Sequence, residues 1–444
     1  MKFIGLCFAF ILLSGCASYG VVDNEPKSES ASAHSYSFET VARRGAGDMS
    51  LMLAFSGGGT RAAALAYGVM LELRDTTVVI DGQPRRLLDE VDFISSVSGG
   101  SFTSAYYGLF GDRIFEDFEE AFLRRNVQST LLHALFNPLR WFSSAGRTEM
   151  AVDLYEKTVF HNKTFADMQR QGGPLILINA SDLGYGVRFS FIQEYFNLLC
   201  SDINSYPVAR AVTASSAVPI LFNPVVLQNY AGCDQSKLAW LESARKRVMD
   251  NAELTQVVEG LETYGKKEQR PYAHFVDGGI TDNLGLRAIY EIVEVSGGVQ
   301  AFLKSVDRRP PGRLVVISVN ASTDPEPEMD KSNKQPSLEE SIGAVSSAQL
   351  HRYNAATLEL MDETLPRWAE DLSTPGRQVQ SHFIQLGFND IDEPDLLRVF
   401  NLIPTSFDLS DEQVDELIKA GRQLIRENPD FQSLLAEQHR ATAK

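Results

Sequence analysis

Residues 91–104 read VDFISSVSGGSFTS, an apolar run that stops at a serine and two glycines before a helical pattern begins. The apolar part has the length and composition of a short buried strand. A serine on a sharp turn between a strand and a helix is typical of a nucleophile elbow, whose usual pattern is Gly-x-Ser-x-Gly. Here Ser98 takes the nucleophile position and Ser96 replaces the first glycine. Taken alone, the pattern leaves two interpretations open, a catalytic Ser98 and a structural tight turn.

Three further apolar runs, residues 51–55, 175–180 and 314–317, have the character of buried strands. An Ala-rich helical pattern covers residues 60–74. Short buried strands that alternate with helices predict an α/β fold with a mostly parallel sheet covered on both faces. The chain of 444 residues is long enough to bury the core that such a sheet needs.

A glycine-rich loop, residues 56–61, follows the first of these strands and opens the Ala-rich helix. Consecutive glycines at a helix N-terminus let several backbone N–H groups point at one anion. Such a loop suits a phosphate, and it equally suits the oxyanion of an acyl-transfer reaction. The loop lacks the Lys-Ser/Thr pair of a P-loop and the spacing of a dinucleotide-binding fingerprint, which counts against nucleotide binding. A plain glycine-rich turn is the remaining interpretation.

The sequence DGG at residues 277–279 ends another apolar run and precedes Asp282. It fits a strand-end turn followed by a helix cap. An aspartate between a strand and glycines also suits the base for a serine, if the carboxylate is partly buried and bonds the serine directly. His274 would be needed for a Ser-His-Asp triad. Strand alternation puts His274 and Asp277 on opposite faces, so we expect a structural role for His274.

In chain order, the glycine loop, the serine elbow, the segment ASSAVP at residues 214–219 and the DGG turn resemble the patatin-like phospholipase family. The resemblance covers residues 48–325. It implies a three-layer α/β/α fold with a mostly parallel central sheet, a Ser–Asp dyad, and chemistry without a metal or an organic cofactor. Ser96 departs from the family pattern, which leaves the geometry of the elbow to be tested.

Each site residue follows from this resemblance. Ser98 matches the nucleophile and Asp277 the base. The family's oxyanion hole and its supporting basic residue match Gly57, Gly58, Gly59 and Arg61. The activity implied is that of a serine lipid acyl hydrolase acting on a phospholipid or another lipid ester.

The N-terminus predicts export. Lys2 precedes an apolar run of 11 residues, 3–13, which is too short to span a bilayer and suits a signal-peptide core. The run ends in LSGC at residues 13–16, which resembles the lipobox of bacterial lipoproteins. This resemblance implies a signal peptide over residues 1–15 and a lipidated Cys16 that anchors the chain to the cell envelope. Ala17 in place of an aspartate favours the outer membrane; an ordinary signal peptide with an incidental cysteine is the alternative.

The overall charge limits the possible partners. Lys and Arg number 41 against 58 Asp and Glu, a formal charge of −17. This balance argues against a general nucleic-acid binder and against membrane attachment through a polybasic patch. Cys200 and Cys233 are either a disulfide or two separate buried thiols. The chain has no CxxC pattern and only seven histidines, so we expect no metal site.

Three regions lie outside the chemical motifs. Residues 16–47, rich in Ser, Ala and Glu, predict a lipidated tether. Residues 326–444 predict a helix-rich C-terminal extension with one more strand at 382–387. Its helices begin at two capping boxes, Ser337 with Glu340 and Ser410 with Gln413. The apolar segment 131–142 suits core packing, or a lid or interfacial helix that admits lipid.

Two classes of function remain in view. One is a membrane-anchored lipid acyl hydrolase that uses Ser98 and Asp277. The other is a non-catalytic lipoprotein that binds lipid or a partner on the same scaffold. The two share a fold, and they differ in whether Ser98 becomes acylated.

Overall fold

The structure is a computed structural model that describes residues 19–27, 35–38, 48–80, 82–125, 146–219, 221–233, 239–326 and 328–442. The predicted signal peptide 1–15, Cys16 and the apolar segment 131–142 lie outside these residues. Within them, no helix combines the length and the apolar character needed to cross a bilayer.

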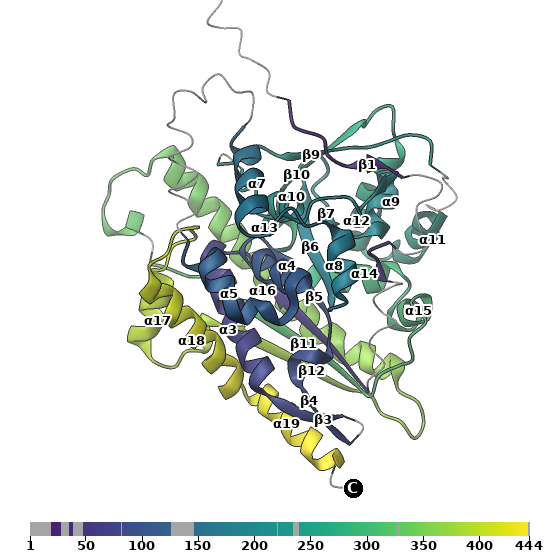
Figure 1. Cartoon of the computed structure of the whole chain (residues 1–444), viewed down its shortest axis with the longest axis vertical. Helices are drawn as coiled ribbons and strands as arrows, with labels where there is room; N and C mark the ends of the chain where they lie inside the picture. Colours follow the sequence, from purple (N-terminus) through teal and green to yellow (C-terminus); the bar gives the residue numbers. More distant parts are fainter. Residues whose placement is uncertain are drawn as a thin grey trace, which may run out of the picture.

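The apolar runs of the sequence form one eight-stranded sheet (Figure 1). Its strands, in spatial order, are β12 (Gln380–Gly387), β11 (Arg313–Asn320), β2 (Met49–Phe55), β5 (Val91–Val97), β6 (Leu175–Asp182), β10 (Tyr272–Asp277) and β9 (Val225–Gln228), with β7 (Arg188–Ser190) also paired to β6. The first five run parallel, and β10 and β9 are antiparallel to their neighbours. The predicted mostly parallel sheet is therefore confirmed. Small ribbons pair β1 (Glu25–Pro26) with β8 (Ser201–Asp202) and β3 (Thr77–Ile80) with β4 (Gln83–Arg86).

Helices cover both faces of the sheet, as the three-layer prediction requires (Figure 1). α3 (Gly59–Asp75), α4 (Gly99–Phe110) and α10 (Val208–Ser215) pack together on one face, and α14 (Leu286–Val295) and α16 (Leu338–Leu372) pack together on the other. Further helices are α5 (Ile114–Phe118), α7 (Arg147–Thr158), α8 (Phe165–Gln171), α9 (Gln193–Leu198), α11 (Ala239–Val248), α12 (Ala252–Glu262), α13 (Gly279–Asp282), α15 (Val299–Ser305), α17 (Pro394–Asn401), α18 (Asp411–Glu427) and α19 (Pro429–Thr442).

The C-terminal region is part of this core. β12 pairs with β11 over its whole length, so the strand predicted at residues 382–387 exists and extends the sheet. α18 lies against α3 at a close crossing, where a Cβ on Gly68 would come within 2.2 Å of the Ile418 carbonyl oxygen. Both predicted capping boxes are present, at the N-termini of α16 and α18.

Parts of the predicted tether are packed on the domain. Residues 25–26 form β1 against β8, and Asn24 donates a hydrogen bond to Ser201 at 3.1 Å. Tyr36 and Phe38 are buried in the core. Residues 19–27 and 35–38 therefore do not behave as a free tether, because buried rings and strand pairing hold them in place.

The two cysteines left open by the sequence form a disulfide. Cys200 and Cys233 are bonded, with their Cα atoms 5.4 Å apart. The bond joins the end of α9 to the segment that follows β9, close to the docked N-terminal residues.

Candidate active site

The serine elbow predicted at residues 96–100 is present at the carboxyl end of β5. Ser98 has φ 49° and ψ −119°, a conformation that non-glycine residues rarely adopt. The turn brings strand and helix so close that a Cβ on Gly99 would lie 1.9 Å from the Gly59 carbonyl oxygen. A Cβ on Gly100 would lie 2.7 Å from the Phe55 Cβ. The two glycines are therefore required by close backbone approach, as a nucleophile elbow demands.

Ser96, the departure from the usual pattern, fits the elbow through hydrogen bonds. Its side chain is fully buried. Ser104 of α4 donates to its hydroxyl oxygen at 2.6 Å, and Ser96 donates to the Leu177 carbonyl at 3.3 Å. The added hydroxyl is therefore satisfied, and the strand-to-helix turn forms with a serine at this position.

Ser98 and Asp277 meet directly. The Ser98 hydroxyl donates to Asp277 Oδ2 at 2.9 Å, and the backbone N–H of Gly279 donates to Asp277 Oδ1 at 2.8 Å. Asp277 is the last residue of β10, which lies two strands from β5 in the sheet. The two oxygens of the carboxylate are thus held by separate donors, which fixes its orientation toward the serine.

The segment 214–219 holds both members of this pair. Ser215 accepts a hydrogen bond from the Ser98 backbone N–H at 2.8 Å and itself donates to the Asn179 carbonyl at 2.6 Å. The backbone N–H of Asp277 donates to the Ala217 carbonyl at 3.0 Å. The sequence placed this segment among the motifs, but its role as a shared brace depends on backbone contacts that carry no residue signature.

Burial raises the pKa of Asp277 from 3.8 to about 6. The hydrogen bonds from Gly279 and Ser98 oppose this rise, because they stabilise the charged form. A carboxylate with a raised pKa is a stronger base than one in water. His274 is exposed and pairs with Val226 in β9, so its predicted separation from Asp277 is confirmed.

The glycine loop lies against Ser98, but its three glycines are not equivalent. The N–H of Gly57 donates to the Asn283 carbonyl at 2.9 Å. This N–H is therefore already bonded, although the family resemblance assigns Gly57 to the oxyanion hole. Gly58 and Gly59 adopt φ values of 139° and 61°, and their N–H groups make no hydrogen bond within the described part of the chain. These two N–H groups are available to an anion at the start of α3. Asn283, which ties the loop, was not identified from the sequence.

Arg61 is buried and bonded to the chain on three sides. Its guanidinium donates to the carbonyls of Ala321 at 2.8 Å and Ile403 at 2.6 Å, and to the Thr405 hydroxyl at 3.0 Å. Burial lowers its pKa to about 10, a value at which the group stays charged at neutral pH. These bonds fit the predicted support of the glycine loop, and they leave little of the guanidinium for a lipid phosphate.

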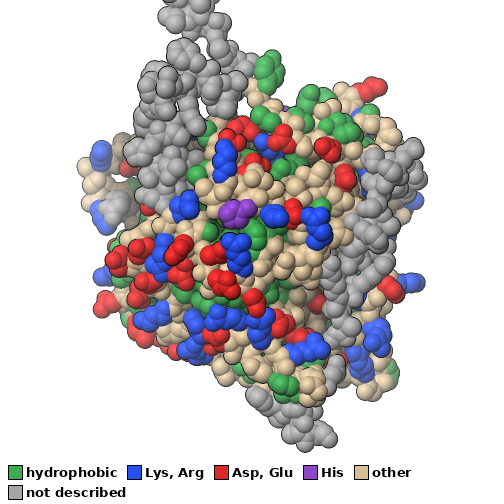
Figure 2. All heavy atoms as spheres, in the orientation of Figure 1, with side chains coloured by type: hydrophobic (Ala, Val, Ile, Leu, Met, Phe, Trp, Pro, Cys, Tyr) green, Lys and Arg blue, Asp and Glu red, His purple; other side chains and the backbone are tan. Residues whose placement is uncertain are grey.

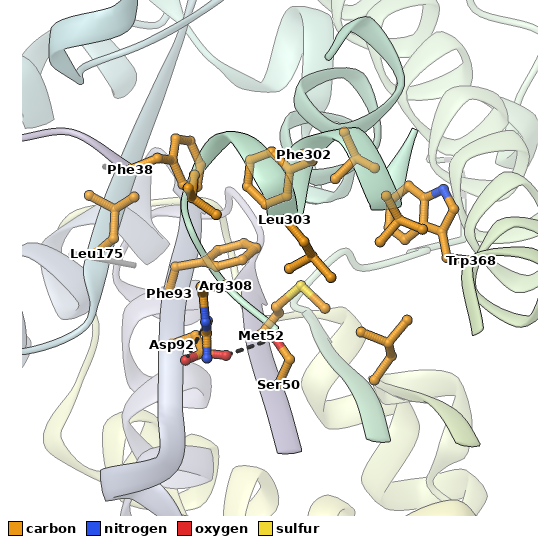
Figure 3. Close-up of a pocket in the computed structure, with 14 residues that line it drawn as sticks. Phe38, Ser50, Met52, Asp92, Phe93, Leu175, Phe302, Leu303, Arg308 and Trp368 are labelled. Carbon is orange, nitrogen blue, oxygen red and sulfur yellow. Dashed lines mark hydrogen bonds and ion pairs between the residues drawn. The ribbon is translucent and has the colours of Figure 1, made fainter. Parts of the chain in front are cut away.

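A separate cavity of about 50 Å³ lies at the opposite ends of the strands (Figure 3). Its lining is mostly apolar, with rings from Phe38, Phe93 and Phe302. Asp92 accepts from Ser50 at 2.7 Å and pairs with Arg308 at 2.9 Å. Asp92 stands at the start of β5, whereas Ser98 follows its end, so this cavity is not part of the Ser98–Asp277 site. The described residues hold no group of three or more His, Cys, Asp or Glu side chains placed to bind a metal.

A family model described as patatin-like phospholipase matches residues 53–290, just over half of the chain. The chain belongs to this family. The matched region contains the glycine loop, Ser98 and Asp277. No curated protein matches the chain.

Solved structures resemble the chain at low sequence identity. Human GIVD cytosolic phospholipase A2 has 10% identity and a TM-score of 0.48, covering 97% of this chain and 69% of that one. The same human protein in complex with methyl gamma-linolenyl fluorophosphonate has 12% identity and a TM-score of 0.42, covering 89% and 60%. VipD from Legionella pneumophila has 11% identity and a TM-score of 0.34, covering 97% and 73%.

Proposed function

We propose that this protein is a serine lipid acyl hydrolase that uses Ser98 as nucleophile and Asp277 as base. The observation that carries the proposal is the 2.9 Å hydrogen bond between the two side chains at a nucleophile elbow. Membership in the patatin-like phospholipase family supports lipid hydrolysis as the reaction. The raised pKa of Asp277 supports its role as a base.

The reaction follows from these groups. Asp277 takes the hydroxyl proton as Ser98 Oγ attacks the ester carbonyl, and the negative oxygen binds the N–H groups of Gly58 and Gly59. Collapse of this intermediate breaks the ester bond, and the leaving alcohol takes the proton from Asp277. Water then attacks the acyl-serine, with Asp277 again as base. The fatty acid leaves and the Ser98 hydroxyl is restored.

The location of the substrate is part of the proposal. The lipobox-like residues 13–16 favour a lipidated Cys16, and Ala17 in place of an aspartate favours the bacterial outer membrane. Membrane lipids would then be the substrate at hand, which agrees with a lipid acyl hydrolase. Mass spectrometry of the mature protein tests this part, because acylation adds a defined mass to an N-terminal Cys16.

Ester hydrolysis by variants tests the dyad. We expect Ser98→Ala and Asp277→Asn each to lose at least about a thousandfold in turnover of acyl esters. Ser305→Ala is a matched control, since its exposed hydroxyl bonds only the nearby Phe302 carbonyl, and its turnover should equal that of the wild type. A fluorophosphonate should label Ser98 in the wild type.

The outcome separates the two classes of function. Equal activity in all four proteins would place the chemistry elsewhere. A folded wild type that neither cleaves esters of any chain length nor reacts with the fluorophosphonate would leave the non-catalytic lipid- or partner-binding lipoprotein as the better hypothesis. Thermal melting of each variant confirms that it is folded.

A further inference from the structure

Several side chains on one side of the β9–β10 pair are exposed. Paired residues of neighbouring strands project to the same side of a sheet. His274 pairs with Val226, and Tyr272 pairs with Gln228. Phe275 pairs with Asp182, so the next residue, Leu183, lies opposite His274, and its backbone N–H donates to the His274 carbonyl at 2.9 Å. Leu183, Tyr272 and His274 are all exposed, and Val226 is half-buried.

α13 continues this side toward the dyad. The hydroxyls of Thr281 and Ser181 lie 2.8 Å apart, and Ser181 precedes Leu183 by two residues in β6, so it faces the same side. Ile280 of α13 is 54% exposed, close to the exposure of Leu183 at 55% and Tyr272 at 48%. Ile280 also follows Asp277 by three residues. The exposed apolar side therefore reaches the turn that holds the candidate base.

The N-terminal segment lies on the same side. A Cβ on Gly20 would meet Val226 Cγ2 at 2.3 Å, so the backbone of Gly20 rests on the strand that carries this face. Its neighbours Tyr19 and Val21 are 88% and 41% exposed. Figure 2 shows hydrophobic side chains at the top of the view, the region where Figure 1 labels β9, β10 and β1. We call Tyr19, Val21, Leu183, Tyr272 and Ile280 the β9–β10 face.

We propose that the β9–β10 face rests on the lipid bilayer and sets the orientation of the enzyme on its membrane; this inference rests on the proposed lipidation and hydrolysis. Cys16 stands three residues before Tyr19, and an extended chain of that length spans about 10 Å. A lipid on Cys16 would therefore enter the bilayer beside this face. Tyrosine suits the boundary between lipid and water, because its ring is apolar and its hydroxyl is polar.

The charge of the protein indicates whether the membrane surface it contacts is anionic or zwitterionic. Glu25 lies among the docked N-terminal residues, Asp23 is paired with Arg210 at 2.6 Å, and the chain as a whole carries −17. An anionic surface would repel this protein. Zwitterionic phospholipid is therefore the surface expected here, held by apolar insertion rather than by charge.

Vesicle binding tests the face separately from the chemistry. The chain from residue 17 contains every described residue and lacks the lipid. We expect Leu183→Glu/Tyr272→Glu to bind phosphatidylcholine–phosphatidylethanolamine vesicles at least about tenfold more weakly than the wild type. Met249→Glu is the control: Met249 is 68% exposed and directly follows α11, which lies apart from β9 and β10 in Figure 1, so vesicle binding should not change. Hydrolysis of a short soluble ester should be equal in all three proteins.

The lipidated mature chain gives the second measurement. The lipid anchor keeps every variant on the vesicle. If a variant hydrolyses vesicle phospholipid more slowly than the wild type but a soluble ester equally fast, its orientation on the membrane has changed. If the wild type does not bind vesicles, or if the double variant binds them equally well, the proposed membrane role of the β9–β10 face is refuted. Ester hydrolysis is unaffected by that result. Selective loss of binding in the double variant supports the face even if no protein cleaves esters, and in that case the hydrolase proposal fails alone.

Discussion

Replacing Asp277 by asparagine should stabilise the folded protein against the wild type, and this gain should be larger at neutral pH than at acid pH. Burial raises the pKa of Asp277 from 3.8 to about 6, so the folded state holds this proton more tightly than the unfolded state. The stability of the wild type therefore falls as the pH rises between these two values. A difference of about two pKa units corresponds to about 3 kcal/mol.

Asparagine keeps the shape of the side chain and cannot ionise, so it escapes this cost. Its Oδ1 can still accept from the Gly279 N–H, and the Ser98 hydroxyl can accept from its amide. The pKa of Asp282 is also raised to about 6 by burial, but Asp282 is present in both proteins. Its contribution therefore cancels when the two are compared.

Urea unfolding of wild type and Asp277→Asn at pH 4, 6 and 8, with the disulfide intact, measures the effect. The free energy of unfolding of the variant minus that of the wild type should grow by about 2–2.5 kcal/mol from pH 4 to pH 8, because Asp277 is already more than half ionised in the unfolded chain at pH 4. Wild-type ester hydrolysis should rise with pH through about 6, since the base must be ionised. A difference that stays flat, or grows toward acid pH, would refute the assignment of a buried carboxylate with a raised pKa.

Three further perturbations follow from the geometry of the site. Gly99→Ala places a Cβ against the backbone of the glycine loop, so it should lower the free energy of unfolding by at least about 3 kcal/mol and abolish most ester hydrolysis. Gly173→Ala, with open space around its Cβ, should change neither quantity. Melting curves and turnover measure both variants. Arg61→Lys loses the fork that bonds two carbonyls and a hydroxyl, and should lower stability by about 2–3 kcal/mol and slow hydrolysis about tenfold, measured by urea unfolding and steady-state rates. Replacing Cys200 and Cys233 by alanine should lower the unfolding free energy by about 3–4 kcal/mol without altering the rate of hydrolysis.

The sequence predicts the fold, and places Ser98 and Asp277 at strand ends, for a physical reason. Buried parallel strands are continuous apolar runs, and each run here becomes a strand of the sheet. Ser98 and Asp277 each follow such a run, at positions that glycines mark as tight turns. The family resemblance predicts that the two residues meet. The strand pattern alone does not, because β10 lies two strands from β5 and runs antiparallel to β6.

The remaining features of the site depend on backbone contacts between distant segments. The Gly57 N–H bonds the Asn283 carbonyl, and the Ser98 N–H bonds the Ser215 hydroxyl. A carbonyl oxygen is present at every residue, so no pattern of side chains reveals which one will accept. The packed N-terminal residues were missed for a related reason: Tyr36 and Phe38 are isolated apolar residues in a polar stretch, and only the cavities they fill make them structural.

The C-terminal region has a direct bearing on the glycine loop. A loop of consecutive glycines has high conformational entropy, so its N–H groups are useful to an oxyanion only if neighbouring groups hold them still. Asn283 supplies one of those groups, and others come from beyond the family match, which ends at residue 290. The Thr60 N–H donates to the Ser406 carbonyl at 2.9 Å, and Arg61 bonds the Ile403 carbonyl and Thr405. Residues 403–406 thus brace the loop at the start of α3, and β12 and α18 hold that brace to the sheet and to α3. The candidate oxyanion loop is therefore held in place by contacts from the C-terminal region as well as from the family-matched part of the chain.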